Sequence, residues 1–201
     1  MEFSSKEHYP SGSYGLISVL PIRTRRLSLR PFEPADADAL YGLHRDQRVA
    51  RYAGGVKTKA ESSESLKRVI DRTSSSGFGP LALEEKNSGA VIGWCGIQIM
   101  PGTDLYEVIY ALQVAQWGKG LASEASTAIF CQAFRLKDPD IDEIFALVYS
   151  QNVKSRFVLE RLAMTFVKNR LDTISQRYAS LYSVSRDTFL EQYGSLSDPV
   201  A

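Results

Sequence analysis

The chain has little of the chemistry that metal sites and disulfide scaffolds need, since its 201 residues include only two cysteines and two histidines. Cys95 and Cys131 lie in apolar surroundings without the spacing of a zinc site, so we expect two buried, reduced thiols. His8 belongs to a polar N-terminal stretch, which leaves His44 as the histidine of the fold. No Gly-x-Ser-x-Gly turn accompanies His44, which argues against a serine hydrolase triad. We therefore predict a protein that holds no metal.

Long apolar runs and an excess of charge of one sign are also absent. Lys plus Arg number 24 and Asp plus Glu number 23, a net charge of +1 that argues against a dedicated duplex-DNA binder. No apolar run approaches the ~20 residues of a membrane-spanning helix. The first eight residues lack the apolar core of a signal peptide. We expect a cytoplasmic protein whose partners include neither nucleic acid nor a membrane.

Hydrophobic periodicity predicts one mixed α/β domain over residues 21–190, with a flexible tail at 1–20 and another at 191–201. A Ser-rich loop at 74–77 follows the second predicted helix, and Asp138-Pro139-Asp140 is expected to stop the third. Alternating or β-branched runs predict strands at 26–30, 79–85, 90–100, 105–114, 144–149, 165–168 and 178–184. Apolar spacings of three and four predict helices at 36–44, 60–73, 121–136 and 155–162.

A Gly-x-Gly turn between a predicted strand and a predicted helix is the most informative segment. It reads Trp117-Gly118-Lys119-Gly120-Leu121-Ala122. A helix N-terminus offers unpaired N–H groups and partial positive charge, and glycines let an anion approach closely, so the turn is suited to phosphate. The alternative is that it is only a tight connection. Two known phosphate motifs fail, because Gly120 replaces the P-loop Ser or Thr and Ser123 replaces the third glycine of a dinucleotide fingerprint.

This segment resembles the acetyl-CoA loop of the GNAT N-acetyltransferase superfamily, Gln/Arg-x-x-Gly-x-Gly/Ala, in the branch similar to ribosomal-protein N-terminal acetyltransferases. The resemblance continues in Glu107-Val-Ile-Tyr-Ala-Leu112 and in Asn152-Val-Lys-Ser-Arg-Phe-Val-Leu-Glu-Arg-Leu162. Weaker similarity covers 23–30, 49–55 and 91–96. The family fold is a mixed sheet of about seven strands with about four helices, whose two central strands splay apart around the cofactor.

The resemblance implies acetyl-CoA as co-substrate and assigns positions to it. The backbone of Leu112 and Val114 would pair with the pantetheine arm, and Asn152 and Ser155 would flank the thioester. The acceptor would lie against residues 49–73. The residues presenting N–H groups to the pyrophosphate would be Trp117, Gly118, Lys119, Gly120, Leu121, Ala122 and Ser123.

Two residues are candidates for proton transfer. Glu107, where this branch often has a glutamate, would act as general base through a water; otherwise it is an exposed strand carboxylate or part of a structural salt bridge. Ser155 would donate to the departing sulfur, and it also suits an N-cap. The tyrosine that many relatives have later in this helix is replaced by Leu159. Tyr110 is equally suited to line an acceptor pocket or to pack in the core.

Two further segments are interpreted as structural. Cys95 has no neighbouring cation to activate it, so we predict a packed thiol. The cluster Arg23-Thr24-Arg25-Arg26 is interpreted as a solvated strand edge rather than a contact to phosphates or RNA.

The sequence thus predicts an acetyl-CoA-dependent N-acetyltransferase that acetylates a primary amine, on a protein N-terminus or a small molecule, by direct transfer in a ternary complex. The alternative is a non-catalytic acyl-CoA-binding protein on the same fold. The oligomeric state is open between monomer and homodimer.

Overall fold

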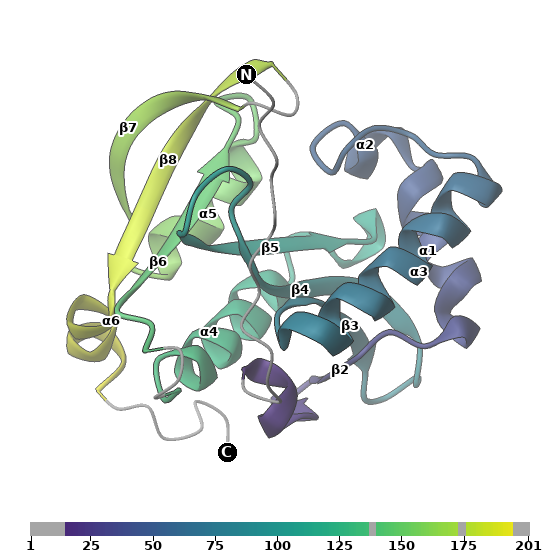
Figure 1. Cartoon of the computed structure of the whole chain (residues 1–201), viewed down its shortest axis with the longest axis horizontal. Helices are drawn as coiled ribbons and strands as arrows, with labels where there is room; N and C mark the ends of the chain where they lie inside the picture. Colours follow the sequence, from purple (N-terminus) through teal and green to yellow (C-terminus); the bar gives the residue numbers. More distant parts are fainter. Residues whose placement is uncertain (1–14, 137–139, 173–175, 195–201) are drawn as a thin grey trace.

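The computed structural model describes residues 15–136, 140–172 and 176–194, which form one open eight-stranded sheet with helices on both faces (Figure 1). The strand order is β1-β2-β3-β4-β5-β6-β8-β7. The strands are β1 (Ile22–Arg23), β2 (Leu27–Arg30), β3 (Gly79–Glu85), β4 (Val91–Ile99), β5 (Tyr106–Leu112), β6 (Glu143–Val148), β7 (Thr165–Asp172) and β8 (Arg177–Ser185). The α-helices are α1 (Ala37–Arg45), α2 (Gln47–Ala50), α3 (Lys59–Ser76), α4 (Leu121–Ala133), α5 (Val153–Arg161) and α6 (Arg186–Tyr193).

The sheet consists of two antiparallel halves that meet at the junction of β5 and β6. β4 and β5 are paired at seven positions, from Gly93↔Leu112 to Ile99↔Tyr106. The parallel neighbours β5 and β6 share one paired position, Glu107↔Phe145. In Figure 1, β5 runs between the group α1, α2 and α3 and the group β6, β7, β8 and α5. The central strands therefore diverge from Glu107 onward, as the family resemblance implied.

Alternation along the strands builds a core on each face of the sheet. Leu81 and Leu83 of β3 belong to the larger core, which α4 covers, whereas Ala82 between them belongs to a smaller core under α1 and α3. Successive strand side chains point to opposite faces, so one strand serves both cores. The central strands are consequently buried from both sides and form a firm base for any site at their edge.

The helix α3 is longer than predicted and includes part of the expected loop. Thr58 caps its N-terminus in a capping box with Glu61, and Gly77, at φ 72°, ends it in the left-handed conformation. Ser76 is still helical, and its hydroxyl donates to the Arg72 carbonyl oxygen at 2.9 Å. The prediction of a loop over Ser74–Ser76 was therefore wrong, and the helix stops at the glycine.

Both ends of the predicted domain need correction. Leu16 begins a 3₁₀-helix (Leu16–Val19) and is buried in the larger core, so this part of the expected tail is folded. Helix α6 was missed; its Phe189 is fully buried against the rings of Phe130 and Phe134, and the helix crosses the predicted boundary at 190. Residues 1–14 and 195–201 of the tails, and the helix stop at 138–139, lie outside the described residues.

Within the described ranges, no helix has both the length and the apolar character that crossing a bilayer requires.

Candidate active site

A cavity of about 700 Å³ opens where β5 and β6 diverge. One wall comes from β5 and the end of β4, and the opposite wall from β6 and the start of α5. The segment from Arg48 to Gly54, in and after α2, covers one side. The Tyr52 hydroxyl donates to the Gln151 carbonyl oxygen at 3.2 Å and so joins this cover to the opposite wall. Of the expected acceptor wall at 49–73, only the part before α3 lines the cavity.

At the C-terminal end of β5, the Gly-x-Gly loop (residues 117–120) turns the chain directly into α4. Gly118 and Gly120 have φ of 77° and 76°, left-handed values that other residues adopt at a cost of about 1–2 kcal/mol. Gly120 is the N-cap, so the unpaired N–H groups of the first turn, at Leu121, Ala122 and Ser123, follow immediately. The loop and helix thus have the strand–turn–helix geometry that the sequence predicted.

Trp117 connects this loop to β5 and α5. Its indole N–H donates to the Leu112 carbonyl oxygen at 2.9 Å, and its backbone N–H donates to the Val114 carbonyl oxygen at 3.1 Å. The Lys154 ammonium lies 4.4 Å from the centre of the indole ring. The carbonyl oxygens of Leu112 and Val114, whose backbone the family resemblance assigns to the pantetheine arm, therefore each accept a hydrogen bond from within the protein.

The N–H of Leu112 faces the cavity. Gln113 donates its N–H to the carbonyl of Ile92, its partner on β4. Hydrogen-bonded and non-hydrogen-bonded positions alternate along an antiparallel pair, so the backbone groups of Leu112 point away from β4 and toward β6. Since β6 has diverged there, the Leu112 N–H is a donor that this edge can offer to a ligand.

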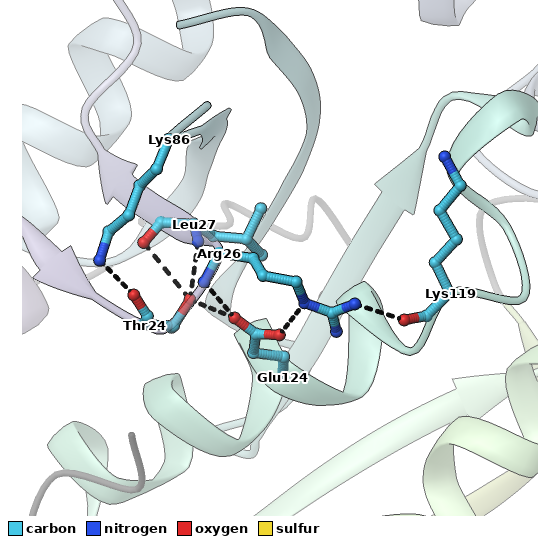
Figure 2. Close-up of polar contacts among 6 residues, drawn as sticks. All are labelled: Thr24, Arg26, Leu27, Lys86, Lys119 and Glu124. Carbon is cyan, nitrogen blue, oxygen red and sulfur yellow. Dashed lines mark hydrogen bonds and ion pairs between the residues drawn. The ribbon is translucent and has the colours of Figure 1, made fainter. Parts of the chain in front are cut away.

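Arg26 fixes the loop through the contacts shown in Figure 2. Its Nη1 donates to the Lys119 carbonyl oxygen at 2.9 Å, and its Nε donates to Glu124 of α4 at 2.6 Å. The hydroxyl of Thr24 donates to the same carboxylate at 2.6 Å. Burial, which opposes ionisation, is outweighed by these hydrogen bonds, so the pKa of Glu124 lies below its ordinary value. The interpretation of Arg26 as part of a solvated strand edge was therefore wrong.

This arrangement orients the peptide between Lys119 and Gly120. In a trans peptide the C=O and N–H point in opposite directions, so holding the Lys119 carbonyl toward Arg26 turns the Gly120 N–H away from it. A Cβ built at Gly120 would lie 3.7 Å from Arg26 Nη2 and 3.9 Å from Arg161 Nη1. Two guanidinium groups therefore flank a helix N-terminus, and this combination fits a diphosphate.

Glu107, at the opposite end of β5, lies inside the cavity wall rather than on an exposed strand. It is 8% exposed, and Gln98 on β4 donates its side-chain amide to the carboxylate at 3.3 Å. Glu107 is also the residue at which β5 and β6 are still paired. A buried carboxylate lining a cavity has the placement that a general base needs.

Ser155 and Tyr110 form a hydrogen-bonded pair across the cavity, with 2.7 Å between their side-chain oxygens. Burial raises the pKa of Tyr110 above its usual range, partly offset by Ser155, so the phenol stays protonated near neutral pH. Ser155 is not the N-cap of α5: Asn152 is, and its side-chain oxygen accepts from the Ser155 N–H at 3.3 Å. Tyr110 lines the cavity and also packs on the core.

Cys95 is a packed thiol, as predicted. It is fully buried, its sulfur lies 3.4 Å from the Ser126 hydroxyl, and burial raises its pKa to about 12. Among the residues described by the structure, no three His, Cys, Asp or Glu side chains gather in a way that could hold a metal ion.

Sequence reasoning missed several side chains at the site. The hydrogen bond between Tyr110 and Ser155 joins residues 45 positions apart in the sequence. The contact between Arg26 and Glu124 joins residues 98 positions apart. Arg170, on β7, reaches the cavity beside Met100, 70 residues earlier. The local sequence contains no signal for the last two contacts. The Tyr110–Ser155 pair had a partial signal, because both residues lie in segments flanking the Gly-x-Gly loop.

Comparisons with known proteins agree with this geometry. The model of the acetyltransferase (GNAT) domain family matches residues 26–165. The uncharacterized protein YkkB of Bacillus subtilis (strain 168) is 29% identical over 148 residues, which are 72% of this chain and 85% of YkkB. The acetyltransferase from Agrobacterium tumefaciens str. C58 superposes with a TM-score of 0.70 at 26% identity, over 82% of this chain and 93% of its own. Mycobacterium smegmatis RimJ in complex with CoA-disulfide gives a TM-score of 0.67 at 16% identity, over 80% and 82% of the two chains.

Proposed function

The chain belongs to the acetyltransferase (GNAT) domain family, and from that premise we propose that it moves the acetyl group of acetyl-CoA to a primary amine in a ternary complex. The observation that supports this most is one cavity joining the Gly-x-Gly loop end of β5 to the buried carboxylate of Glu107. A protein that only binds an acyl-CoA has no need of a carboxylate on the far side of the thioester position.

The loop end would hold the cofactor. The N–H groups of Gly120, Leu121, Ala122 and Ser123 would face the pyrophosphate, with Arg26 and Arg161 beside them. The Leu112 N–H would pair with the pantetheine arm in place of the missing strand contact. When bound, acetyl-CoA supplies a thioester carbonyl and a thiolate leaving group. Lys119 contributes through its backbone, because its ammonium is hydrogen-bonded to Gln116 at 2.9 Å.

Transfer forms a C–N bond and breaks a C–S bond, so the amine must lose a proton and the sulfur must be stabilised or protonated. Glu107 accepts the proton, directly or through a water, because an ammonium group has no lone pair for attack. A free thiol has a pKa of ~8.5, so the demand at the sulfur is mild.

Ser155 and Tyr110 serve the sulfur side. If the Tyr110 O–H donates to Ser155 Oγ, the Ser155 hydroxyl proton is free to point at the sulfur. The raised pKa of Tyr110 keeps that donor protonated throughout the neutral range. This pair takes the place of the tyrosine that Leu159 replaces in α5.

Glu107→Gln tests the transferase function. After a screen of primary amines and N-terminal peptides has found an acceptor, the variant should lose ~10²–10⁴-fold in kcat. Acetyl-CoA affinity, measured by titration calorimetry, should remain unchanged. The loss should shrink at high pH, where the free amine is abundant. Glu143→Gln, which removes an exposed carboxylate from β6, is the matched control and should keep full activity.

Two results would contradict the proposal. A Glu107→Gln variant with wild-type rates at neutral pH would clear Glu107 of the role of base. A protein that binds acetyl-CoA but acetylates no amine in the screen would be the non-catalytic acyl-CoA-binding protein instead.

A further inference from the structure

The charged side chains that line the cavity are strongly unequal in sign. Among the described residues, Glu107 is the one carboxylate in the lining, whereas the cations are Arg48, Arg51, Lys154 and Arg170. A cavity built for a polycationic amine would need the opposite balance, because like charges disfavour binding. The excess of cations in the lining therefore disfavours acceptor amines that have several positive charges.

Three of the four cations already have a partner among the described residues. Arg48 makes a two-point ion pair with Asp46, at 3.0 and 2.7 Å. Lys154 lies over the Trp117 ring at the loop end of the cavity, where it belongs with the cofactor. Arg51 lies 5.2 Å from the Tyr52 ring at the exposed rim.

Arg170 differs from these because it is half-buried and makes no ion pair with a described carboxylate. Its Nη1 donates to the sulfur of Met100 at 3.0 Å, and a thioether is a weak acceptor. The Nε and Nη2 atoms are left along one edge of the guanidinium, and this edge matches the two oxygens of a carboxylate. A partly desolvated cation without an anion is costly, so a bound anion would stabilise it.

The position of Arg170 assigns it to the acceptor rather than to the cofactor. Met100 directly follows β4, two residues beyond Gln98, whose side chain contacts Glu107. Glu107 and Leu112 are five residues apart on β5, about 17 Å at the usual strand rise. Arg170 therefore lies at the Glu107 end, too far from the Gly-x-Gly loop to reach the diphosphate.

We propose that the acceptor is a primary amine that also has a carboxylate, with the amine at Glu107 and the carboxylate on the free edge of Arg170. This inference rests on the proposed function and specifies its substrate class. Arg51 at the rim adds long-range attraction for the same anion. Polyamines and other polycationic amines are disfavoured. The carboxylate can belong to a small amino acid or to an acidic side chain near a peptide N-terminus.

Three amines of equal chain length test the charge preference: 4-aminobutyrate, butylamine and 1,4-diaminobutane. For the wild-type protein, kcat/KM should be at least about tenfold higher for 4-aminobutyrate than for butylamine, and lowest for the diamine. Ala-Asp-Asp-Ala-amide against Ala-Asn-Asn-Ala-amide provides the peptide arm, so the two arms show which source of the carboxylate is used.

Substitution of Arg170 shows whether it causes the preference. Arg170→Gln should lower the ratio of 4-aminobutyrate to butylamine about tenfold, and Arg170→Glu should invert it in favour of the diamine. The KM for acetyl-CoA should not change. Lys168→Gln removes an exposed cation from the same strand and should leave the ratio as in the wild type.

Several outcomes would overturn the inference: equal or better use of butylamine or the diamine by the wild type, or a preference that survives Arg170→Gln. If acetyl-CoA binds and no amine is acetylated, the proposed function fails. Calorimetric binding of the same three amines to the protein–acetyl-CoA complex then decides the charge preference separately, and weaker binding of 4-aminobutyrate than of butylamine would refute it.

Discussion

The two ends of the cavity are built differently. At the loop end, Arg26, Thr24 and Glu124 connect the turn between β1 and β2, the Gly-x-Gly loop and the first turn of α4 through direct hydrogen bonds of 2.6–2.9 Å. At the Glu107 end, Arg170 contacts a thioether and Arg51 lies over a tyrosine ring at the rim. At the loop end these side chains are thus satisfied within the protein and hold the backbone N–H groups of the turn in place, whereas at the Glu107 end a side-chain donor, Arg170, is left for a ligand.

This difference corresponds to the two proposed ligands. A diphosphate has fixed geometry, so a preorganised loop would lose little entropy on binding it. Specificity for the proposed acceptor would depend on a few charges on walls from separate elements, the segment after α2 and β7, which can change without disturbing the loop. Substitutions at the two ends should therefore separate cofactor affinity from acceptor choice.

The largest expected effect on cofactor affinity comes from Gly120→Val. The left-handed conformation at Gly120 is strained for any residue with a Cβ and more so for a branched one, so the N–H groups of the turn move away from the anion. We expect acetyl-CoA affinity to fall about 100-fold or more, measured by calorimetry, with the circular dichroism spectrum unchanged. Gly194→Val is the matched control, since Gly194 has φ 75° and ends α6 away from the cavity. Wild-type affinity in Gly120→Val would refute the role of the loop.

Tyr110→Phe changes the middle of the cavity, between the loop end and the Glu107 end. The variant keeps the ring and removes the hydroxyl that is hydrogen-bonded to Ser155, so the Ser155 hydroxyl loses its fixed direction. We predict a fall of about tenfold in kcat with the KM for acetyl-CoA unchanged. Single-turnover rates would check that the chemical step is affected. A Ser155→Ala variant that loses nothing further when combined with Tyr110→Phe would show that the two act as a unit.

Arg26→Met should have the smallest effect on acetyl-CoA affinity, because Arg26 contributes largely by orienting the loop that binds the ligand. In this variant the Lys119 carbonyl loses the hydrogen bond from Arg26, and Glu124 loses its counterion. We therefore expect acetyl-CoA to bind about fivefold more weakly. Binding of S-acetylpantetheine, which has no diphosphate, should not change. Adding Glu124→Gln should restore part of the affinity, and the exposed Arg25→Met serves as control. Equal weakening of both ligands would contradict a role confined to the diphosphate.

The elements around the cofactor end could be predicted because their signals are local. The strand before Trp117, the two glycines and the apolar spacing of α4 lie within one continuous stretch, and the structure places them as expected. The N-cap of α5 was assigned to Ser155 as an alternative, but Asn152 three residues earlier suits that position equally well and takes it. Capping preferences rank residue types and do not fix which of two neighbours is used.

The contacts of Arg26, Arg170 and Leu16 could not be predicted from the sequence. Each depends on strands or helices brought together over many residues, and an arginine on a strand has the same local pattern whether it faces solvent or a cavity. Helix α6 was missed for a related reason, since Phe189 is its one buried residue and gives no periodic pattern. Tertiary packing, rather than propensity, holds that helix in place.

The single paired position between β5 and β6 also affects the stability of the folded state. A ligand that lies between these strands supplies contacts across the gap, and it binds the folded chain but not the unfolded one. By mass action such a ligand stabilises the folded state by ~2.7 kcal/mol when its free concentration is a hundred times its Kd. If acetyl-CoA is that ligand, as proposed, the resistance of the protein to heat and proteolysis should rise with the concentration of acetyl-CoA, and the thermal midpoint would report that concentration.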